Sequence, residues 1–594
     1  MERAVSPESS CRSEPPKLQC PTISPSPSTV STTLDTALPD VFGHHEDRVL
    51  KAHPAGLPDQ VSNGEGRQAG SGNTPVVHNN NKSQVIQPLG LKFFVAAFTA
   101  SLTGFIVGYD LGCVAVVLNP VQTAFQLCGS TFTCPEKSMF IALISPGAAL
   151  GGVTGGLLAD AFGRRAALVF SDMLVFSAGL LISLGEIFAM LLVGRFLLGL
   201  GAGIGFVVFA AYISEITPES IRGALVASQE ILQVIGCLAA YAAAWGVGAE
   251  QWRPLTGVIA CLGLLQLACL LLFLPESPRW LVQRGMLRNA EASLRRLGTK
   301  RADAEAHVLS LQQQTAHQAP PGIAQFLHQI RSGLSSHRRV LALAVACAFA
   351  HVATGANTVQ YFVVDIFQFG GICDTRAPDL AVGVAKMLGV VACVALADSW
   401  GRRPLLILGV TGSCLSHLFS SISFAWLQAT RGKLSGMCLP DDTTGGLSNL
   451  ATPSYLILGS ILGYIFFWSI GWACLMLVVS SEILPTCVRG LGIGFTTMTF
   501  SLLVFILQSS LEPLFGVATP AGTFGILWFT SVFSLLFIVV AVPEGKGRSL
   551  EDVQREQETY SKEVDRHFAR GKIGGAGSSG EHRRPASQDV VVAK

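Results

Sequence analysis

Long apolar segments follow one another through the middle of the chain, separated by short polar loops. A membrane-spanning helix needs about 20 mostly apolar residues. Two of the segments, 255–274 and 521–542, contain no Asp, Glu, Lys or Arg. A helix exposed to water needs a polar face, and a membrane β-barrel needs alternating polar positions. The pattern instead predicts twelve spanning helices, at 91–119, 138–160, 166–186, 188–213, 223–247, 255–274, 339–367, 378–398, 404–428, 453–481, 489–512 and 521–542.

The composition supports an all-α membrane protein. Only 13% of the 594 residues are charged, where an ordinary soluble protein has about 25%. A net charge of +2 offers no basic surface for nucleic acid. The sequence has no CxxC pair, nucleophile elbow or phosphate loop, so we expect no metal, no cofactor and no enzyme activity. We expect a monomer in a lipid bilayer.

Three polar segments divide the chain into five parts. Residues 1–88 are rich in Ser, Thr and Pro and cannot bury enough apolar surface to fold, so we predict a disordered tail. We expect two six-helix bundles, at 89–274 and 339–543, joined by a helical linker at 275–338. A polar tail, 544–594, follows the second bundle.

The distribution of Lys and Arg predicts the orientation in the membrane. Loops between spans two and three, four and five, six and seven, eight and nine, and ten and eleven carry most of them. The opposite loops carry only Lys137, Arg253, Arg376, Arg431 and Lys433. Because basic loops stay in the cytoplasm, both termini should be cytoplasmic, and we expect a multi-pass protein of the plasma membrane. Cys128 and Cys134 share the first external loop, and the sequence leaves open whether they form a disulfide.

Two loop motifs occur once in each predicted bundle. The stretch 160–165 reads Asp-Ala-Phe-Gly-Arg-Arg, and 398–403 reads Asp-Ser-Trp-Gly-Arg-Arg. A second motif, Ser-Glu-Ile at 214–216, ends in Arg-Gly and has its counterpart at 481–490. Two parallel six-helix repeats are the architecture of an alternating-access carrier, whose binding site lies between the repeats.

The charged residues of these loops are candidate gates. The glycines permit a tight turn between helices, and the arginines lie beside acidic residues with which they can form and break ion pairs. The alternative is that Gly-Arg-Arg only anchors the chain at the membrane surface. The candidate gating residues are Asp160, Arg164, Arg165, Glu215, Arg222, Asp398, Arg402, Arg403, Glu482 and Arg489, with Glu276 and Glu544 after spans six and twelve.

Taken in order, the motifs resemble the sugar porter, or glucose-transporter-like, family of the major facilitator superfamily. The resemblance covers about residues 91–552. Besides the two Gly-Arg-Arg loops it includes Gly-Phe-x-x-Gly-Tyr-Asp-x-Gly at 104–112, Pro-Glu-Ser-Pro-Arg-Trp-Leu at 275–281 and Pro-Glu-x-Lys-Gly-Arg-Ser-Leu-Glu at 543–551. It implies a twelve-helix carrier with a cytoplasmic helical linker that moves a hexose or a polyol.

The positions that bind sugar in this family differ here. The resemblance places Glu230 and Lys386 in the central cavity, where the family usually has Gln and Asn, and His351 where it has Gln. Only Asn357 remains of the expected amides. We take these four as candidate solute-binding residues. Because an isolated buried charge is costly, we predict that Glu230 and Lys386 form an ion pair.

Asp110 and Arg195 are charges inside predicted spans, and such residues are functional candidates. In proton-driven family members the matching pair couples proton to sugar. A permanent structural pair is the alternative reading. We therefore predict a carrier of a monosaccharide or polyol that symports protons. A facilitative uniporter, an organic-ion carrier and a non-transporting nutrient sensor remain alternatives.

Overall fold

The computed structural model describes residues 90–128, 134–315, 338–431, 451–484 and 489–544. The predicted tail 1–88, and the tail 544–594 apart from Glu544, lie outside the described residues. In the described ranges the regular structure is entirely helical. The all-α membrane fold predicted from the sequence is confirmed.

The first half of the chain, which we call the N-half, supplies six predicted spans. Its helices are long and continuous even where they contain a proline, as α1 does at Pro120, and a short helix precedes the second long one. They are α1 (Leu91–Ala124), α2 (Pro135–Ala142), α3 (Ile144–Phe162), α4 (Arg164–Leu184), α5 (Phe188–Ile216), α6 (Glu219–Val247) and α7 (Trp252–Phe273).

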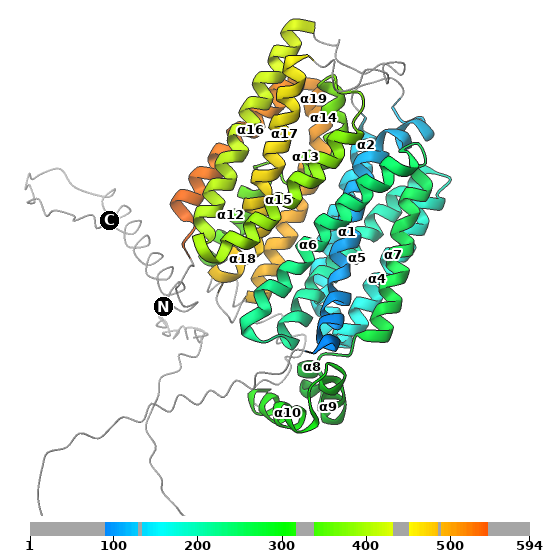
Figure 1. The fold of residues 1–594 in the computed structure, drawn as a ribbon, viewed down its shortest axis with the longest axis vertical. Coiled ribbons are helices and arrows are strands. Elements are labelled where there is room, and N and C mark those ends of the chain that lie inside the picture. Colours follow the sequence, from blue (N-terminus) through cyan, green and yellow to red (C-terminus); the bar gives the residue numbers. More distant parts are fainter. Residues whose placement is uncertain (1–89, 129–133, 316–337, 432–450, 485–488, 545–594) are drawn as a thin grey trace, which may run out of the picture. The chain divides into compact units, whose positions relative to one another are not determined.

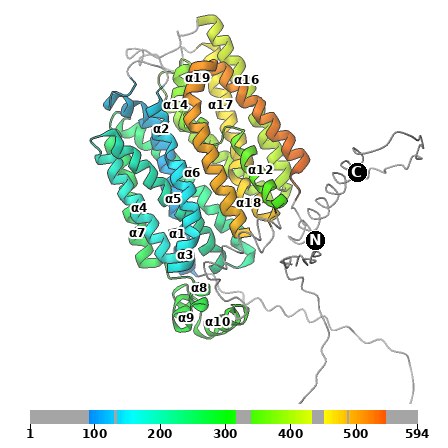
Figure 2. The same ribbon diagram turned by 180° about the vertical axis from the view of Figure 1, so that it is seen from behind.

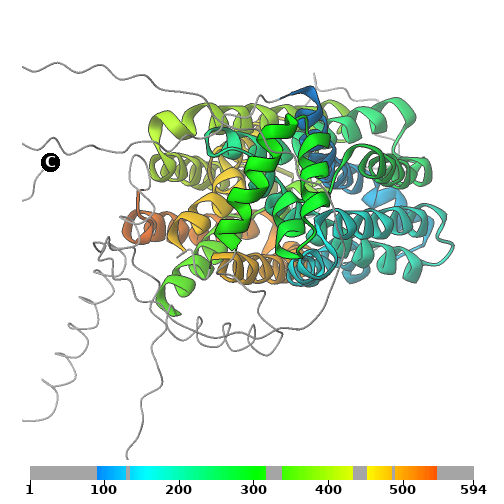
Figure 3. The ribbon, with the colours of Figure 1, turned by 90° about the horizontal axis from the view of Figure 1, so that it is seen from below.

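The second half, the C-half, has more interruptions. Its elements are α12 (Arg338–Val352), α13 (Thr358–Tyr361), α14 (Val363–Phe369), α15 (Arg376–Trp400), α16 (Arg402–Arg431), α17 (Thr452–Trp468), the π-helical turn η3 (Ser469–Ala473), α18 (Cys474–Ile483) and α19 (Arg489–Ala541). Figures 1 and 2 show both halves from opposite sides, and Figure 3 shows them from below, with the N-half in blue to green and the C-half in yellow-green to orange.

Ten described helices are long and apolar enough to cross a membrane. The last of them, Gly492–Ala541, covers two predicted spans, because the chain reverses at Thr519 (φ 61°) before Pro520. Predicted span seven does not reach the required length, because it is divided among α12, α13 and α14. Together these helices account for the twelve predicted spans.

Glycines allow the helices of the N-half to pack closely. A side chain at Gly108 would collide with the backbone of Gln233 on α6, and one at Gly151 with the backbone of Leu200 on α5. Many large apolar side chains instead lie on the outer surface: Leu272 is 75% exposed and Val540 is 71% exposed. Exposed apolar area on this scale suits a lipid environment and not water.

The break in span seven is held by side chains from three other helices. The backbone turns at Gly355 (φ 93°) and Ala356 (φ 40°). The carbonyl of Ala353 accepts a hydrogen bond from Thr530, and that of Ala356 accepts one from Tyr464. The ring of His417 lies 3.1 Å from the carbonyl of Thr354. Non-helical backbone within a membrane is stable only when its polar groups are satisfied in this way.

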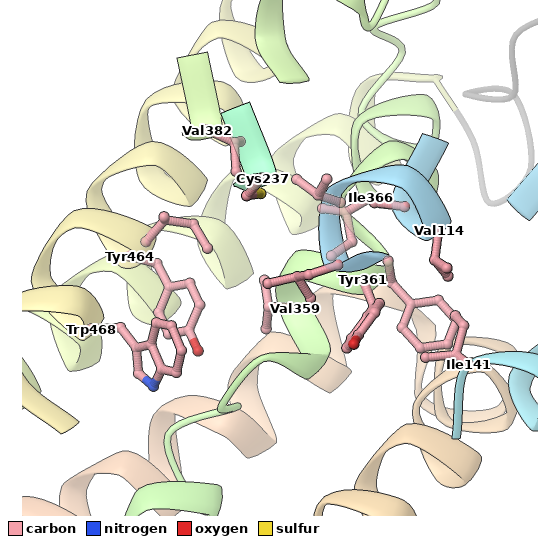
Figure 4. Packing of buried hydrophobic residues seen from close by; sticks show 14 of the residues in the cluster. Val114, Ile141, Cys237, Val359, Tyr361, Ile366, Val382, Tyr464 and Trp468 are labelled. Carbon is pink, nitrogen blue, oxygen red and sulfur yellow. The ribbon is translucent and has the colours of Figure 1, made fainter. Parts of the chain in front are cut away.

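One apolar core continues from the N-half into the C-half. Figure 4 shows Val359, Tyr361 and Ile366 of the broken span next to Val114 and Ile141 of the N-half. Tyr464 and Trp468 of α17 close the other side. The broken span therefore lies where the two halves meet.

The described residues of the linker, as far as Thr315, form three short helices, α8 (Pro278–Gln283), α9 (Leu287–Arg296) and α10 (Arg301–Thr315). In Figure 2 α8 lies next to the end of α3, with α9 and α10 (green) beyond it. Trp280 Nε1 donates to the carbonyl of Asp160 at 3.0 Å, and Arg284 donates to the same carbonyl at 2.9 Å. The described part of the linker is thus attached to the N-half.

Candidate functional site

Asp110 on α1 and Arg195 on α5 form an ion pair in the interior of the N-half. Arg195 Nη1 lies 2.5 Å from Asp110 Oδ1, and the two side chains are at most 1% exposed. Arg195 Nε also donates to the carbonyl of Phe140, and its guanidinium lies 5.3 Å from the centre of that ring. The second oxygen of Asp110 and Nη2 of Arg195 have no hydrogen-bond partner. The pair is therefore neutral overall but incompletely bonded, so a changed contact can release the carboxylate.

The predicted ion pair between Glu230 and Lys386 is not formed in this structure. Lys386 on α15 is 1% exposed and donates to Gln360 Oε1 at 3.2 Å, while its ammonium lies 5.8 Å from the centre of the Trp468 ring. Glu230 on α6 accepts from the amide of Gln233, at 2.9 and 3.2 Å when that amide is turned to donate. Gln233 lies less than one turn along the same helix, so it reaches the carboxylate before Lys386 does.

His351 is buried in an aromatic box near the break in span seven. Its ring stacks on Phe500 at 4.8 Å and on Trp472 at 5.9 Å, and Nδ1 lies 3.0 Å from Met476 Sδ. Its Nε2 has no partner. Asn357 is half-buried just before α13. The four candidate solute-binding residues thus lie on span seven, α6 and α15, the elements that meet between the halves.

Span ten bends where the family usually has three prolines. The prolines are absent here, and the π-turn η3 takes their place, with Gly471 outside helical geometry (φ −92°, ψ −107°). Gly409 of α16 packs directly against Gly471, so neither position has room for a side chain. Such π-turns are common at functional sites in helices.

The first Gly-Arg-Arg loop is a compact network of charges. Gly163 (φ 102°) turns the chain, and the carboxylate of Glu276 accepts from the backbone amides of Arg164 and Arg165 at 2.7 and 3.1 Å. Arg164 Nη2 lies 2.8 Å from Glu215 and 3.1 Å from Asp160. Arg165 donates to the carbonyl of Leu271. These partners belong to the N-half, except Glu276, which lies at the start of the linker.

The second loop repeats the arrangement in the C-half. Gly401 has φ 98°, and an added side chain there would meet the carboxylate of Glu544. Arg402 Nε lies 3.1 Å from Glu482, and Arg403 donates to the carbonyl of Val539. The side chains of Arg222, Asp398 and Arg489 lie outside the described residues. The pairs described so far hold each half together; none of them joins one half to the other.

The halves are joined on the opposite side, near the disulfide between Cys128 and Cys134, which the structure does contain. We call this the disulfide side and the other the Arg-loop side. Lys137 of α2 pairs with Asp365 of α14 at 2.9 Å, and both side chains are less than 10% exposed. Glu512 of α19 accepts from Ser138 at 2.8 Å and from the backbone amide of Cys134 at 3.2 Å.

Side-chain amides form further hydrogen bonds between the two halves on the disulfide side. Asn119 of α1 donates to Gln368 of α14 at 3.1 Å, and Ser145 of α3 donates to Gln508 of α19 at 3.0 Å. Figure 2 shows α2 next to α14 and α19. We call the contacts of Lys137, Asp365 and Glu512 the disulfide-side lock. The arrangement described here is therefore closed on that side.

Sequence reasoning missed these residues. Lys137, Asp365 and Glu512 lie near the ends of spans, where charges are ordinary, and no motif surrounds them. Gln233 and Gln360 were missed because amides are not costly enough in a span to attract notice. Asp172 did carry a signal, since it is an acid within an otherwise apolar segment at 166–186 that has charge only at Asp172 and Glu186.

Comparison with known proteins extends the motif resemblance. The family model described as "Sugar (and other) transporter" matches residues 96–556. The facilitated glucose transporter member 8 of solute carrier family 2 from Bos taurus is 29% identical, over 78% of this chain and 94% of its own. The galactose-proton symporter of Escherichia coli is also 29% identical, with the same coverage. Myo-inositol transporter 1 of Saccharomyces cerevisiae is 28% identical, over 79% of this chain and 80% of its own.

Solved structures share the fold. The xylose transporter XylE from E. coli, in a partially occluded inward-open conformation, superimposes with a TM-score of 0.63 at 21% identity, covering 77% of this chain and all of the other. At this level of identity the match establishes the major facilitator fold. The substrate has to be argued from this chain's own residues and its relatives.

Proposed function

Because this chain belongs to the sugar (and other) transporter family, and is therefore a multi-pass membrane transporter and not an enzyme, we propose that it carries a monosaccharide or polyol together with a proton. The two halves would rock about the site between them and expose it to each side of the membrane in turn. Sugar, inositol and galactose-proton carriers among its relatives support this class of solute. The proposed transport involves one solute and a proton.

The observation that carries proton symport is the buried pair of Asp110 and Arg195. A carboxylate beside an arginine stays ionised, and it can take up a proton once the arginine moves away. The pair lies on α1 and α5, and a proton on Asp110 would replace the guanidinium as the group that neutralises the carboxylate when Arg195 moves away. A uniporter has no need of a buried carboxylate that can be released.

The solute would contact Glu230, His351, Asn357 and Lys386. Glu230 and Asn357 are partly exposed, whereas Lys386 and His351 are buried. Lys386 has three hydrogens to donate and one described acceptor, Gln360. This favours a second candidate solute, an organic anion, which would supply the missing acceptor.

We further propose that the Arg-loop side is cytoplasmic and that the protein works in the plasma membrane. The Lys and Arg distribution supports this orientation. The networks around Glu276 and Glu544 would then be the cytoplasmic ends of the two halves. A monomer would suffice, because the site lies within one chain.

Uptake by the purified full chain in lipid vesicles tests the proposal. Labelled hexoses, polyols and organic anions would be offered with and without an inside-alkaline pH gradient. We expect one polyhydroxylated solute to accumulate only with the gradient, and Asp110→Asn to lose that dependence while still exchanging solute at equal pH. Glu186→Gln, at an exposed acid in the loop after α4, is the matched control. Equal uptake with and without the gradient would favour a uniporter, and binding without flux would favour a sensor.

Exchange of charges tests the roles of Glu230 and Lys386. If the two pair in another state of the cycle, the double variant Glu230→Lys with Lys386→Glu should transport more than either single alanine variant. We expect each alanine variant to lose at least tenfold in initial uptake rate, since each leaves the remaining charge without a counter-charge in that other state. A double variant as inactive as the single variants would exclude such pairing.

A further inference from the structure

Asp172 is a buried acid that the transport site described so far does not use. It lies in the middle of α4 and is 1% exposed. Its Oδ2 has no hydrogen-bond partner, and no Lys, Arg or His of the described ranges lies within ion-pair distance of it. An ionised carboxylate without a cation is very costly in such surroundings. A bound proton removes that cost.

The packing of α4 against α7 shows what the proton would bond. Gly179 lies against Ala260, and Gly263 lies against Phe176, so the two helices run antiparallel in a fixed register. This register places Asp172 level with Gln266 of α7, three residues beyond Gly263. Gln266 is 1% exposed, and its Oε1 also lacks a donor. Two buried acceptors without a donor therefore lie at one level of adjacent helices, and a proton on Asp172 would bring a donor to this level.

Gln266 links this position to the helix that carries Asp110. Its Nε2 donates to Thr103 Oγ1 on α1 at 2.7 Å. Thr103 lies seven residues before Asp110, which is about two turns along one face of the helix. Asp172, Gln266, Thr103 and Asp110 are thus buried polar groups placed in succession on α4, α7 and α1, with the Gln266–Thr103 hydrogen bond as the described contact among them, and we call them the polar line.

Other charges on the surrounding helices are engaged elsewhere. Arg195 of α5 lies nearer the disulfide side than Asp172 does. Its neighbour Gly194 packs against Ala178 and Ile182, which follow Asp172 along α4 toward that side. Arg164 lies at the Arg-loop end of α4, eight residues before Asp172. It binds Asp160 of α3 and Glu215 of α5. Arg253 is exposed at the start of α7. The described parts of these helices offer Asp172 no counter-charge at its own level.

We propose that Asp172 is a second proton-binding carboxylate of the N-half, on the path of the proton between Asp110 and the Arg-loop side. An O–H bond forms on Asp172 when a proton arrives and breaks when the proton leaves, so no other reactant is needed. The inference rests on the proposed proton symport. It adds a residue at which the proton is held after it leaves Asp110.

The test compares Asp172→Asn with the wild type in vesicles. Asparagine keeps the shape and offers Gln266 a permanent donor, but it cannot release a proton. We expect gradient-driven accumulation to fall at least tenfold, exchange at equal pH to stay within twofold, and Asp172→Glu to recover part of the accumulation. Glu186→Gln should behave as wild type. Should Asp172→Asn fail to fold, Thr103→Val, which interrupts the polar line and leaves the acid in place, is expected to show the same loss.

Infrared spectroscopy tests the bound proton without transport. We expect the wild type to show a protonated carboxyl band that is absent from Asp172→Asn. Unchanged accumulation together with an unchanged band in Asp172→Asn would overturn the inference, whereas Asp110→Asn would still test the symport. If solute uptake by the wild type does not depend on the pH gradient, the proposed symport is wrong. The role of Asp172 on a proton path is then wrong as well.

Discussion

Removing either member of the Asp110–Arg195 pair is expected to lower the free energy of unfolding by about 3–5 kcal/mol, because the partner is left as an uncompensated buried charge. The side chains are at most 1% exposed, and Arg195 also holds the carbonyl of Phe140, so water cannot replace the lost partner. Asp110→Ala and Arg195→Ala should each show this loss in thermal or denaturant unfolding of the purified protein.

The double variant separates pairing from packing. Asp110→Ala combined with Arg195→Ala should be much less destabilised than the sum of the single variants, because neither charge remains. Arg288→Ala, at an exposed arginine of α9, is the control and should change stability by less than about 0.5 kcal/mol. Additive losses in the double variant would mean that the two residues do not depend on each other.

Lys137→Ala is expected to shift the protein toward a state that is open on the disulfide side. Lys137 and Asp365 form a nearly buried pair between the halves, and this pair must separate when that side opens. Loss of about 3 kcal/mol from the closed state changes the ratio of closed to open molecules about hundredfold. Spin labels at Met139 and Val517, both exposed near that side, should then report a longer distance between α2 and α19.

Exchanging the charges of Lys137 and Asp365 tests whether their ion pair closes the disulfide side. Lys137→Asp with Asp365→Lys should restore the short distance, while Lys137→Asp alone should place two acids together and favour the open state further. Lys92→Ala, at an exposed lysine of α1, should leave the distance unchanged. A short distance in every variant would show that apolar packing, and not the ion pair, closes this side.

Most of the fold could be predicted from the sequence because lipid imposes a simple rule on span length and polarity. The same rule identified Asp110 and Arg195, since a charge within an apolar span stands out. It could not identify the partners of Lys137 or Glu512, because contacts between halves depend on the state of the rocking motion. The Glu230–Lys386 ion pair was wrong for this state, because Glu230 bonds to Gln233 of its own helix and Lys386 bonds to Gln360 of α13.

The attachment of the linker has a consequence for following the motion. Trp280 and Arg284 bind the backbone at the end of α3, and Ser293 of α9 donates to the carbonyl of Glu276. The helix α8 is therefore bonded to the N-half, and α9 is bonded to the start of the linker at Glu276. A fluorophore on the exposed face of α9 would be displaced measurably when the N-half tilts by a small angle. Such a label would not disturb the helices inside the bilayer.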